Sequence, residues 1–432
     1  MAKTYAIVGT GGRARMFYEA ILGPHREHSR LVAFCDTNQV RMDYTNRVIS
    51  GELHGQAVPT YKAGDFATML AETRPDTVIV TSIDRTHHKY IIAAMEAGCD
   101  VITEKPMTTD LDKLKAILDA QRETGRKVTV TFNYRYTPAR TQVKDILLSG
   151  AIGEVTAVEF SWHLDRVHGA DYFRRWHRYK EKSGGLLVHK STHHFDLMNW
   201  WLGSRPSRVA ATGRRVFYTP ETADRLGLQE RGPRCHECPV FELCPYHLDL
   251  EADDKLRDLY LEQEAFDGYW RDGCVWAEDI TIEDTMQVQA VYANGVSMNY
   301  TLVAYSPWEG LEVKFHGTKG ELTHRHVEVH GVFGGARQHS HEEGFTTTLH
   351  LHGGDAENIP VWTGRGAHGG ADPVMLGYLF DPEGMEPDRY ARSSNHITGA
   401  WSILTGIAAN ASIATGKEVV VDDMLAEKGI AL

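Results

Sequence analysis

The stretch YAIVGTGGRA, residues 5 to 14, decides how the chain begins to fold. Residues 5 to 8 form a short apolar run typical of a buried strand, and a helical pattern follows the glycines. Gly9 permits a tight turn, Gly11 lets the backbone approach a pyrophosphate, and Ala14 lets the helix lie close to the strand. The loop is completed by Gly12 and Arg13. It predicts a dinucleotide site at the start of a helix, whose amide groups favour phosphates.

A second apolar run, LVAFCDTN at 31 to 38, ends in Asp36. An acidic residue at this distance from the glycines accepts hydrogen bonds from a ribose hydroxyl and repels a 2′-phosphate. The pattern therefore predicts NAD as the cofactor in preference to NADP. The alternative is an ordinary turn aspartate after a strand.

Strands and helices continue to alternate through the first third of the chain. We expect strands at 77 to 82, 100 to 106 and 127 to 132, and helices at 88 to 97 and 110 to 123. This alternation predicts a doubly wound parallel sheet in a domain over residues 1 to 132. Ligands of such sheets bind at the carboxyl ends of the strands. The polar residues at these ends are Ser82, Glu104, Lys105 and Asn133.

The rest of the chain, residues 133 to 432, has a different rhythm. Strands are expected at 155 to 164, 207 to 218, 285 to 305 and 311 to 324, with hairpin turns at Asn294-Gly295 and Lys319-Gly320. They predict a large, mostly antiparallel open sheet. One free face would pair with another copy, so we expect a dimer or tetramer. A helix is expected at 397 to 416, and long loops around a site at 333 to 395.

Composition excludes several classes of protein. The 432 residues are 42% apolar and 24% charged, as is ordinary for globular proteins. The net charge of -12 argues against nucleic-acid and anionic-membrane partners. The longest apolar runs are shorter than a membrane span, and the first residues have no signal core. We therefore expect a cytoplasmic location.

The stretch SGGLLVHKSTHHFDLMNWWLG, residues 183 to 203, concentrates titratable groups between apolar runs. On one continuous helix His189, His193 and Asp196 would share a face, at positions i, i+4 and i+7. That stripe could hold a metal ion, present a base to a substrate, or simply face water at a helix start. The spacing alone does not choose among the three.

Three motifs in order carry a resemblance to a known family. GTGGRA at 9 to 14, TEKPM at 103 to 107 and GGLLVHKSTHHFD at 184 to 196 make the chain resemble the Gfo/Idh/MocA family of nicotinamide-dependent oxidoreductases. The resemblance runs from residue 5 to the end of the last long helix. It implies that Lys105 helps to bind the cofactor and the reacting hydroxyl, with a cis bond before Pro106. It also implies site roles for His87, Asn133 and Arg135.

The third motif departs from the family pattern G-G-x-L-x-D-x-G-x-H-x-x-D at two positions. His189 stands where the family has Asp, and Ser191 where it has Gly; the residues that match are Gly184, Gly185, Leu187, His193 and Asp196. The resemblance implies that His193 is the general base. His189 cannot hold a negative charge, so it would make one hydrogen bond or act as a base itself. Which histidine takes the proton stays open.

The family resemblance implies hydride transfer to nicotinamide from a secondary ring hydroxyl of a sugar, cyclitol or glycoside, giving a ketone. Histidine suits proton transfer near neutral pH, and Lys105 would stabilise developing negative charge. One alternative is a glycoside-cleaving enzyme that keeps NAD bound, oxidises transiently and eliminates the aglycone. The other is an NAD-binding sensor without catalysis.

The region 162 to 182 is rich in rings and charges that would suit a polyhydroxylated ligand. We expect Trp162, Arg174 and Trp176 to bind substrate, together with Arg135, Lys105, His189 and His193. The equal alternative is a solvated strand and loop with ordinary surface charges.

A charged insertion at about 218 to 279 contains four of the six cysteines: Cys235, Cys238, Cys244 and Cys274. The C-x2-C-x5-C spacing with one distant Cys suits tetrahedral thiolate ligation, which predicts a structural zinc ion. The alternative is four unligated thiols in a reducing compartment. Either way, the insertion would cap the substrate side or an oligomer contact.

Overall fold

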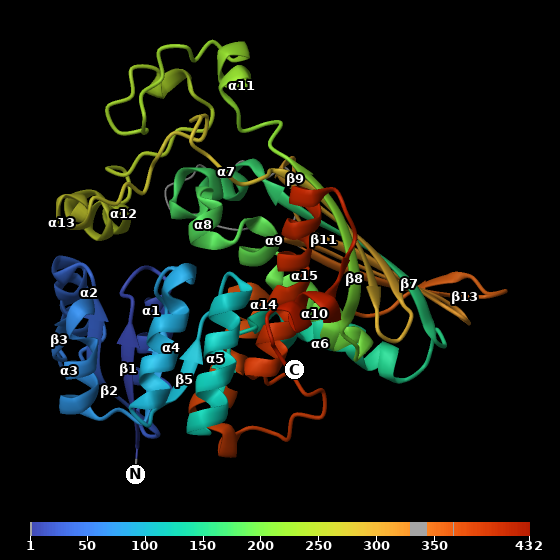
Figure 1. Ribbon diagram of the computed structural model, residues 1–432, viewed down its shortest axis with the longest axis horizontal. Helices are drawn as coiled ribbons and strands as arrows, with labels where there is room; N and C mark the ends of the chain where they lie inside the picture. The colour runs from blue at the N-terminus through green and yellow to red at the C-terminus, as the bar shows by residue number, and fades with distance from the viewer. Residues whose placement is uncertain (1, 329–343, 366) are drawn as a thin grey trace.

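The first sheet is parallel and built from strands that are apolar on both faces. The computed structural model describes residues 2–328, 344–365 and 367–432 (Figure 1). Six strands lie in the order β3-β2-β1-β4-β5-β6, which confirms the doubly wound sheet. Their bounds are β1 Lys3–Val8, β2 Ser29–Asp36, β3 Thr60–Lys62, β4 Thr77–Val80, β5 Asp100–Thr103 and β6 Val128–Val130.

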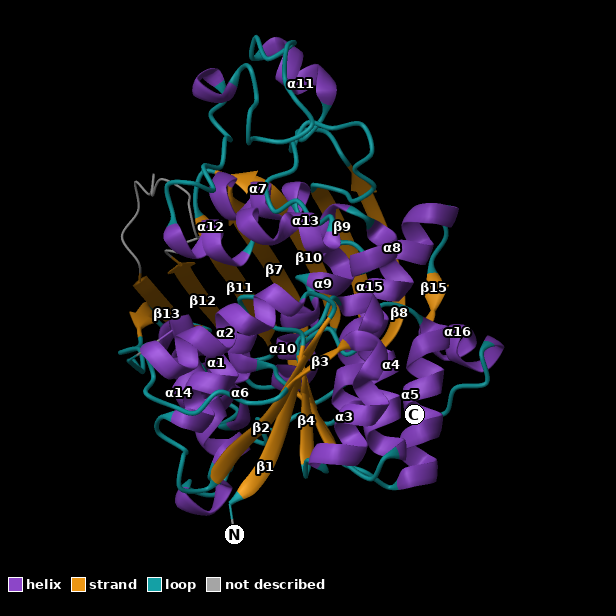
Figure 2. Ribbon diagram, turned by 90° about the vertical axis from the view of Figure 1, so that its left-hand side faces the viewer, coloured by secondary structure: helices purple, strands orange, loops and turns teal. Residues whose placement is uncertain are grey.

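Helices cover both faces of this sheet, which explains why its strands read as continuous apolar runs (Figure 2). One face carries α1 Ala14–Leu22, α2 Gln39–Gly51 and α14 Ala367–Phe380; the other carries α3 Phe66–Thr73, α4 His87–Glu96 and α5 Leu111–Thr124. Helix α14 comes from far along the chain, and the ring of Phe380 lies edge-on to Tyr5 with centroids 5.0 Å apart. The two halves of the sequence are therefore interleaved in space.

The expectation of long loops at 333 to 395 was wrong for much of that segment. Strands occupy 344–351 and 356–358, and α14 occupies 367–380. Residues 329–343 lie outside the described part of the chain. Pro373 and the pair Gly369-Gly370 lie within α14, and these residue types hide a helix from a sequence reading.

The second sheet has nine strands in the order β14-β13-β12-β11-β7-β10-β9-β8-β15. All its neighbours pair antiparallel except β7 and β10, so the prediction of a large, mostly antiparallel open sheet is confirmed. Hairpins join β9 to β10 at Gly295, where φ is +87°, and β11 to β12 at Gly320. The strands are β7 Val155–Asp165, β8 Pro206–Arg214, β9 Thr285–Tyr292, β10 Ser297–Ser306, β11 Glu309–Gly317, β12 Gly320–Glu328, β13 Gly344–Leu351, β14 Ala356–Asn358 and β15 Val419–Val420.

Helices fill the space between the two sheets (Figure 1). They include α6 Pro138–Leu148, α9 Leu186–His189, α10 Thr192–Leu202 and α15 His396–Thr415. Helix α15 is long and apolar enough to cross a membrane, but it packs against β8, α9 and α10, and 56% of its apolar window is buried. Its end at Gly416, with φ at +68°, is where the sequence placed it. The helix α16 Val421–Glu427 follows.

Smaller helices surround the space above the first sheet. Helix α7 Arg166–Arg174 and helix α8 Lys180–Ser183 follow β7. The insertion between β8 and β9 contains α11 Pro220–Arg225, α12 Asp254–Leu259 and α13 Glu264–Asp267. Where the insertion starts and ends, the buried carboxylate of Asp284 accepts hydrogen bonds from the backbone N–H groups of Val216, Phe217 and Tyr218. Figure 1 shows α12 and α13 above α2, at the edge of the parallel sheet.

The outer face of the large sheet is polar. Strands β9 and β10 alternate between buried and more exposed residues, and Gln289 lies opposite Asn299 on the outer face. His316 lies between Glu159 and Glu321 at 3.1 and 3.0 Å. A second copy would meet paired charges and amides here rather than an apolar patch, so the predicted oligomer stays a prediction.

We expect light scattering to give a mass of two or four times 48.4 kDa. Thr301→Lys, near the middle of the outer face on β10, should shift the mass toward one chain because a buried charge disrupts an interface. A wild-type mass of 48.4 kDa would contradict the prediction.

Candidate active site

A cleft of about 800 Å³ opens at the carboxyl ends of the parallel strands, where the second domain faces the first. This volume is within the range of small-molecule sites. The first domain lines it with Gly9, Gly11, Gly12, Arg13, Asp36, Ser82, His87, Glu104 and Lys105; the second domain lines it with Asn133, Trp176, His189 and His193. The structure thus brings together most of the residues that the sequence nominated. Ala14 begins α1 behind the loop and is fully buried.

The first glycine of the loop makes the tight turn after β1, at a position where no side chain fits. Gly9 has φ at +92°, and a Cβ there would lie 2.6 Å from the backbone nitrogen of Ser82. The Asp36 carboxylate accepts hydrogen bonds from the backbone N–H of Thr10 at 2.6 Å and of Asn38 at 2.9 Å. These bonds fix the carboxylate at the end of β2, where a ribose would lie.

Lys105 is positioned by the turn that follows β5. The Lys105-Pro106 bond is cis, as the family resemblance implies. His87 joins this turn to β4: its two ring nitrogens lie 2.9 Å from the carbonyl oxygens of Pro106 and Ser82. Although His87 lines the cleft, its two ring nitrogens contact backbone carbonyls and so stabilise the turn after β5. The Lys105 ammonium donates to the carbonyl oxygen of His189 at 3.1 Å, across the domain junction.

Burial sets the protonation of Lys105. Loss of water around the ammonium lowers the pKa of Lys105 to about 8, although Asp84 and Glu104 oppose this shift. Glu104 is also paired with Arg13, 2.7 Å away. A lysine with this pKa changes charge near neutral pH, which suits proton transfer.

Asp84 is a site residue that the sequence reading missed. Its carboxylate lies 2.5 Å from Nδ1 of His189, and both groups are buried. Burial raises the pKa of Asp84 and lowers the pKa of His189, so desolvation disfavours charge on both groups. The cleft therefore contains a carboxylate beside the position where the family has Asp. Asp84 lies two residues beyond Ser82 in the segment that follows β4, so its place near a strand end could have identified it.

The stripe predicted for residues 189 to 196 does not exist. Helix α9 ends at His189 and α10 begins at Thr192, so the three groups point to different partners. His189 faces Asp84, while the His193 ring stacks on Tyr134 with centroids 4.2 Å apart. Asp196 forms a bidentate ion pair with Arg135, with both contacts at 2.6 Å. The metal alternative for this stretch is therefore excluded by geometry.

Three side chains expected to bind substrate lie outside the cleft lining. Arg135 is buried against Asp196, and Trp162 is fully buried on β7, stacked on His194. Arg174 donates to the carbonyl oxygen of Tyr246 at 3.1 Å and thereby holds the insertion. The two arginines are held by buried partners, as buried charges require, and the Trp162 ring is part of the packed interior.

Lys190 is a second buried lysine in the cleft lining. Its ammonium lies 4.5 Å from the ring centroid of Trp162 and donates to the Tyr134 hydroxyl at 3.3 Å. Burial lowers the pKa of Lys190 as well. Two ammonium groups therefore approach the same space, which suits oxygen-rich and anionic groups of a ligand.

The four cysteines of the insertion surround a small apolar cavity near Trp276 and are all free thiols. Burial raises the pKa of the Cys235 thiol to about 11. Among the described residues, no group of three or more His, Cys, Asp or Glu side chains is arranged to hold a metal ion. The structure does not support the zinc site that the spacing predicted.

Comparison with known proteins covers nearly the whole chain. The protein-family model described as "Oxidoreductase family, NAD-binding Rossmann fold" matches residues 3–132. A second family model, "Oxidoreductase family, C-terminal alpha/beta domain", matches residues 144–368. The protein YteT of Bacillus subtilis, which is named as an oxidoreductase without a substrate, is 34% identical over 98% of both chains. An inositol 2-dehydrogenase of Rhizobium meliloti is 28% identical over 49% of this chain and 58% of its own.

A solved structure extends the similarity of fold. The WlbA dehydrogenase from Bordetella pertussis, in complex with NADH and UDP-GlcNAcA, superposes with a TM-score of 0.63 at 17% identity, over 97% of this chain and 99% of its own. The fold and the glycine loop define an NAD(P)-dependent oxidoreductase with a Rossmann domain. The chain belongs to the Gfo/Idh/MocA oxidoreductase family.

The Arg135–Asp196 pair yields a prediction about stability. Arg135→Met leaves the Asp196 carboxylate buried without its partner, so the free energy of unfolding should fall by about 3–5 kcal/mol. Denaturant unfolding measures this change. The double variant Arg135→Met with Asp196→Leu should recover much of the loss, because no isolated charge remains. If Arg135→Met instead raised the KM for substrate without changing the free energy of unfolding, Arg135 would be a substrate-binding residue.

Proposed function

We propose that the protein uses NAD to oxidise a secondary ring hydroxyl of a sugar, cyclitol or glycoside to a ketone. The observation that carries the proposal is the buried Lys105 ammonium, with its pKa lowered to about 8, in a cleft that also contains the glycine loop and His193. The inositol dehydrogenase and the sugar-nucleotide complex of WlbA support a polyhydroxylated substrate. A cytoplasmic location and a small-molecule partner are parts of the same proposal.

The proton leaves the hydroxyl through groups of this chain. Neutral Lys105 accepts it, and the resulting ammonium returns to its bond with the His189 carbonyl. The hydrogen bond between Asp84 and His189 holds that carbonyl in place beside the ammonium. His193, fixed by its stack on Tyr134, presents its ring to the same cleft as the second proton-transfer group. NAD, when bound, supplies the hydride acceptor.

A second candidate reaction is cleavage of a glycoside with NAD retained throughout. One observation favours it: the Tyr260 hydroxyl accepts a hydrogen bond from the Gly12 N–H at 3.3 Å, so the insertion covers the glycine loop. A cofactor under such a cover would leave slowly. Absorbance at 340 nm separates the reactions, since a simple dehydrogenase accumulates NADH, whereas the cleaving enzyme releases aglycone without accumulation.

Replacing the proton-transfer groups should abolish turnover. We expect Lys105→Met and His193→Ala each to lower kcat/KM by at least about a hundredfold, because each removes a group that acts in proton transfer. Lys115→Met, on the surface of α5, is the matched control and should leave the rate unchanged. Substrate panels of monosaccharides, cyclitols and glycosides identify the reaction. Near-normal rates in both variants would refute the site, and NADH binding without turnover by the wild type on any panel member would favour a sensor.

The pKa of Lys105 sets a pH dependence. The neutral amine is the base, and its fraction grows as pH rises toward about 8. In the direction of alcohol oxidation, kcat/KM should therefore rise about tenfold per pH unit below that pKa and level off above it. Lys105→Arg, which stays protonated throughout, should lose this rise together with most activity. A wild-type profile that is flat from pH 6 to 9 would contradict the role of Lys105.

A further inference from the structure

The insertion builds one wall of the cofactor cleft. Its residues Tyr260, Asp267 and Tyr269 line the cleft together with Gly12 and Asp36. Helix α12 contacts α2 of the first domain, and α13 follows it after the short helix Leu261–Gln263 (Figure 1). The sequence placed this insertion at the substrate side or at an oligomer contact. The structure places part of it over the end of the cleft where Asp36 marks the ribose position.

Tyr260 lies on the glycine loop itself. Its hydroxyl accepts from the Gly12 N–H, and a Cβ at Gly12 would lie 3.5 Å from that oxygen. Amide groups of this loop are the ones that bind a pyrophosphate. The hydroxyl therefore lies beside the phosphate part of the cleft, and Tyr260 borders that part from the side of the insertion.

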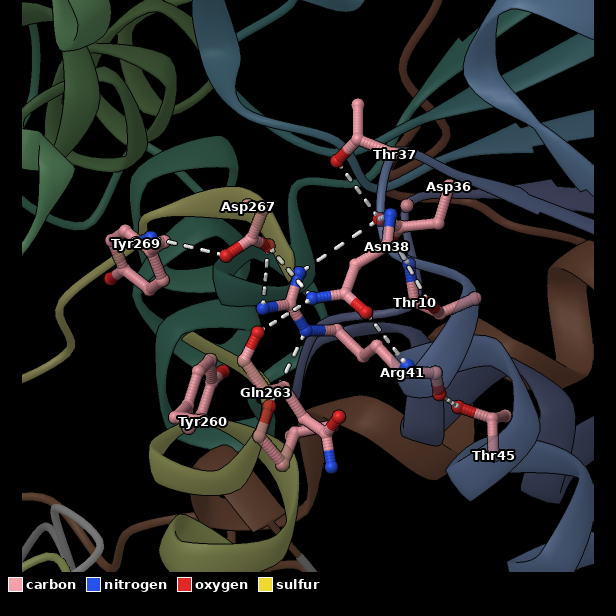
Figure 3. Close-up of polar contacts among 12 residues, drawn as sticks. Thr10, Asp36, Thr37, Asn38, Arg41, Thr45, Tyr260, Gln263, Asp267 and Tyr269 are labelled. Atoms are coloured by element: carbon pink, nitrogen blue, oxygen red, sulfur yellow. Dashed lines mark hydrogen bonds and ion pairs between the residues drawn. The ribbon is translucent and has the colours of Figure 1, made fainter. Parts of the chain in front are cut away.

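Arg41 is the cation nearest to Asp36, and the insertion holds it (Figure 3). Its guanidinium lies 3.0 Å from the Asp267 carboxylate, 3.4 Å from the Leu259 carbonyl oxygen and 3.8 Å from the Asp36 carboxylate. Only 9% of its side chain is exposed. Asp267 also accepts from the Asn38 side chain at 3.1 Å. Two carboxylates thus surround one guanidinium.

This balance of charge bears on the choice between NAD and NADP. A 2′-phosphate adds about two negative charges at neutral pH, and arginine is the side chain best suited to bind it. Arg41 would be placed for that role if it were free, but its guanidinium is already paired with Asp267. The net charge of Asp36, Arg41 and Asp267 together is negative, so it opposes a phosphate.

We propose that Asp267, contributed by the insertion, is a specificity-determining residue that makes the cleft select NAD over NADP, and that Tyr260 retains the bound cofactor. The proposal rests on the proposed function in one respect, namely that this cleft binds NAD. It adds to Asp36 a second determinant, located more than two hundred residues further along the chain.

The test is direct binding of NADH and NADPH, followed by nucleotide fluorescence. Asp267→Asn keeps the shape and the acceptor oxygen but removes the charge, so Arg41 becomes available to a phosphate. We expect the Kd for NADPH to fall at least about tenfold, while the Kd for NADH changes less than about threefold. Asp258→Asn is the matched control: it removes one charge from the same insertion, on α12, where Asp258 pairs with Arg257 outside the cleft lining.

A second variant tests whether Arg41 is responsible for the gain in NADPH affinity. Arg41→Met added to Asp267→Asn should cancel the gain in NADPH affinity, because the freed guanidinium is gone. Thermal unfolding of each variant checks that the fold persists.

For Tyr260→Phe we expect NADH to dissociate about tenfold faster in stopped-flow displacement, since a hydroxyl beside the phosphates is lost. Tyr44→Phe, on α2 outside the cleft lining, is its control.

Each outcome has one meaning. Unchanged NADPH affinity in Asp267→Asn, an equal gain in Asp258→Asn, or a gain that survives Arg41→Met would overturn the role of Asp267. Unchanged NADH dissociation in Tyr260→Phe would overturn the role of Tyr260. These results are distinct from failure of the proposed function, which would appear as a wild-type protein that does not bind NADH at all.

Discussion

The site depends on one desolvated ammonium group at the meeting of two domains. Lys105 comes from the end of β5, and the carbonyl that receives its hydrogen bond belongs to His189 of the second domain. An ammonium in this position is tolerated only because a carboxylate and a carbonyl lie beside it. Proper docking of the domains is thus a condition for the lysine's lowered pKa, and hence for its chemistry.

That docking is secured by elements distant in sequence. Helix α14 covers one face of the parallel sheet, and the backbone N–H of Val130 donates to Ser394 at 3.3 Å just before α15. Arg135 and Asp196 add a buried ion pair between the segment after β6 and α10. The Arg135–Asp196 pair, whose charges suggest a catalytic or binding role in the sequence, therefore helps to fix the relative position of the two sheets. The positions of the two walls of the cleft follow from it.

Local patterns predicted the two sheets, the glycine loop and the place of Lys105 at a strand end. Each follows from short-range periodicity or from the geometry of parallel strands, which a sequence displays directly. The break between α9 and α10 falls at Ser191 and Thr192, residue types that favour a helix start, so the predicted stripe depended on assuming one continuous helix. Residue type alone predicts substrate contacts for Arg135 and Trp162, because it does not reveal which charges and rings will be buried. The argument from strand ends applies to Asp84 as well, since this residue lies in the segment that follows β4.

The insertion joins β8 and β9, two strands that lie side by side in the large sheet. A connection of this kind can gain, lose or exchange residues without altering the register of either strand, because their pairing is already satisfied. The wall that it forms over the glycine loop is therefore free to diverge on its own. Relatives with the same Rossmann motif could acquire a different cofactor preference, or a different rate of cofactor release, through changes in this insertion alone. The sequence of the glycine loop would then not reveal the difference.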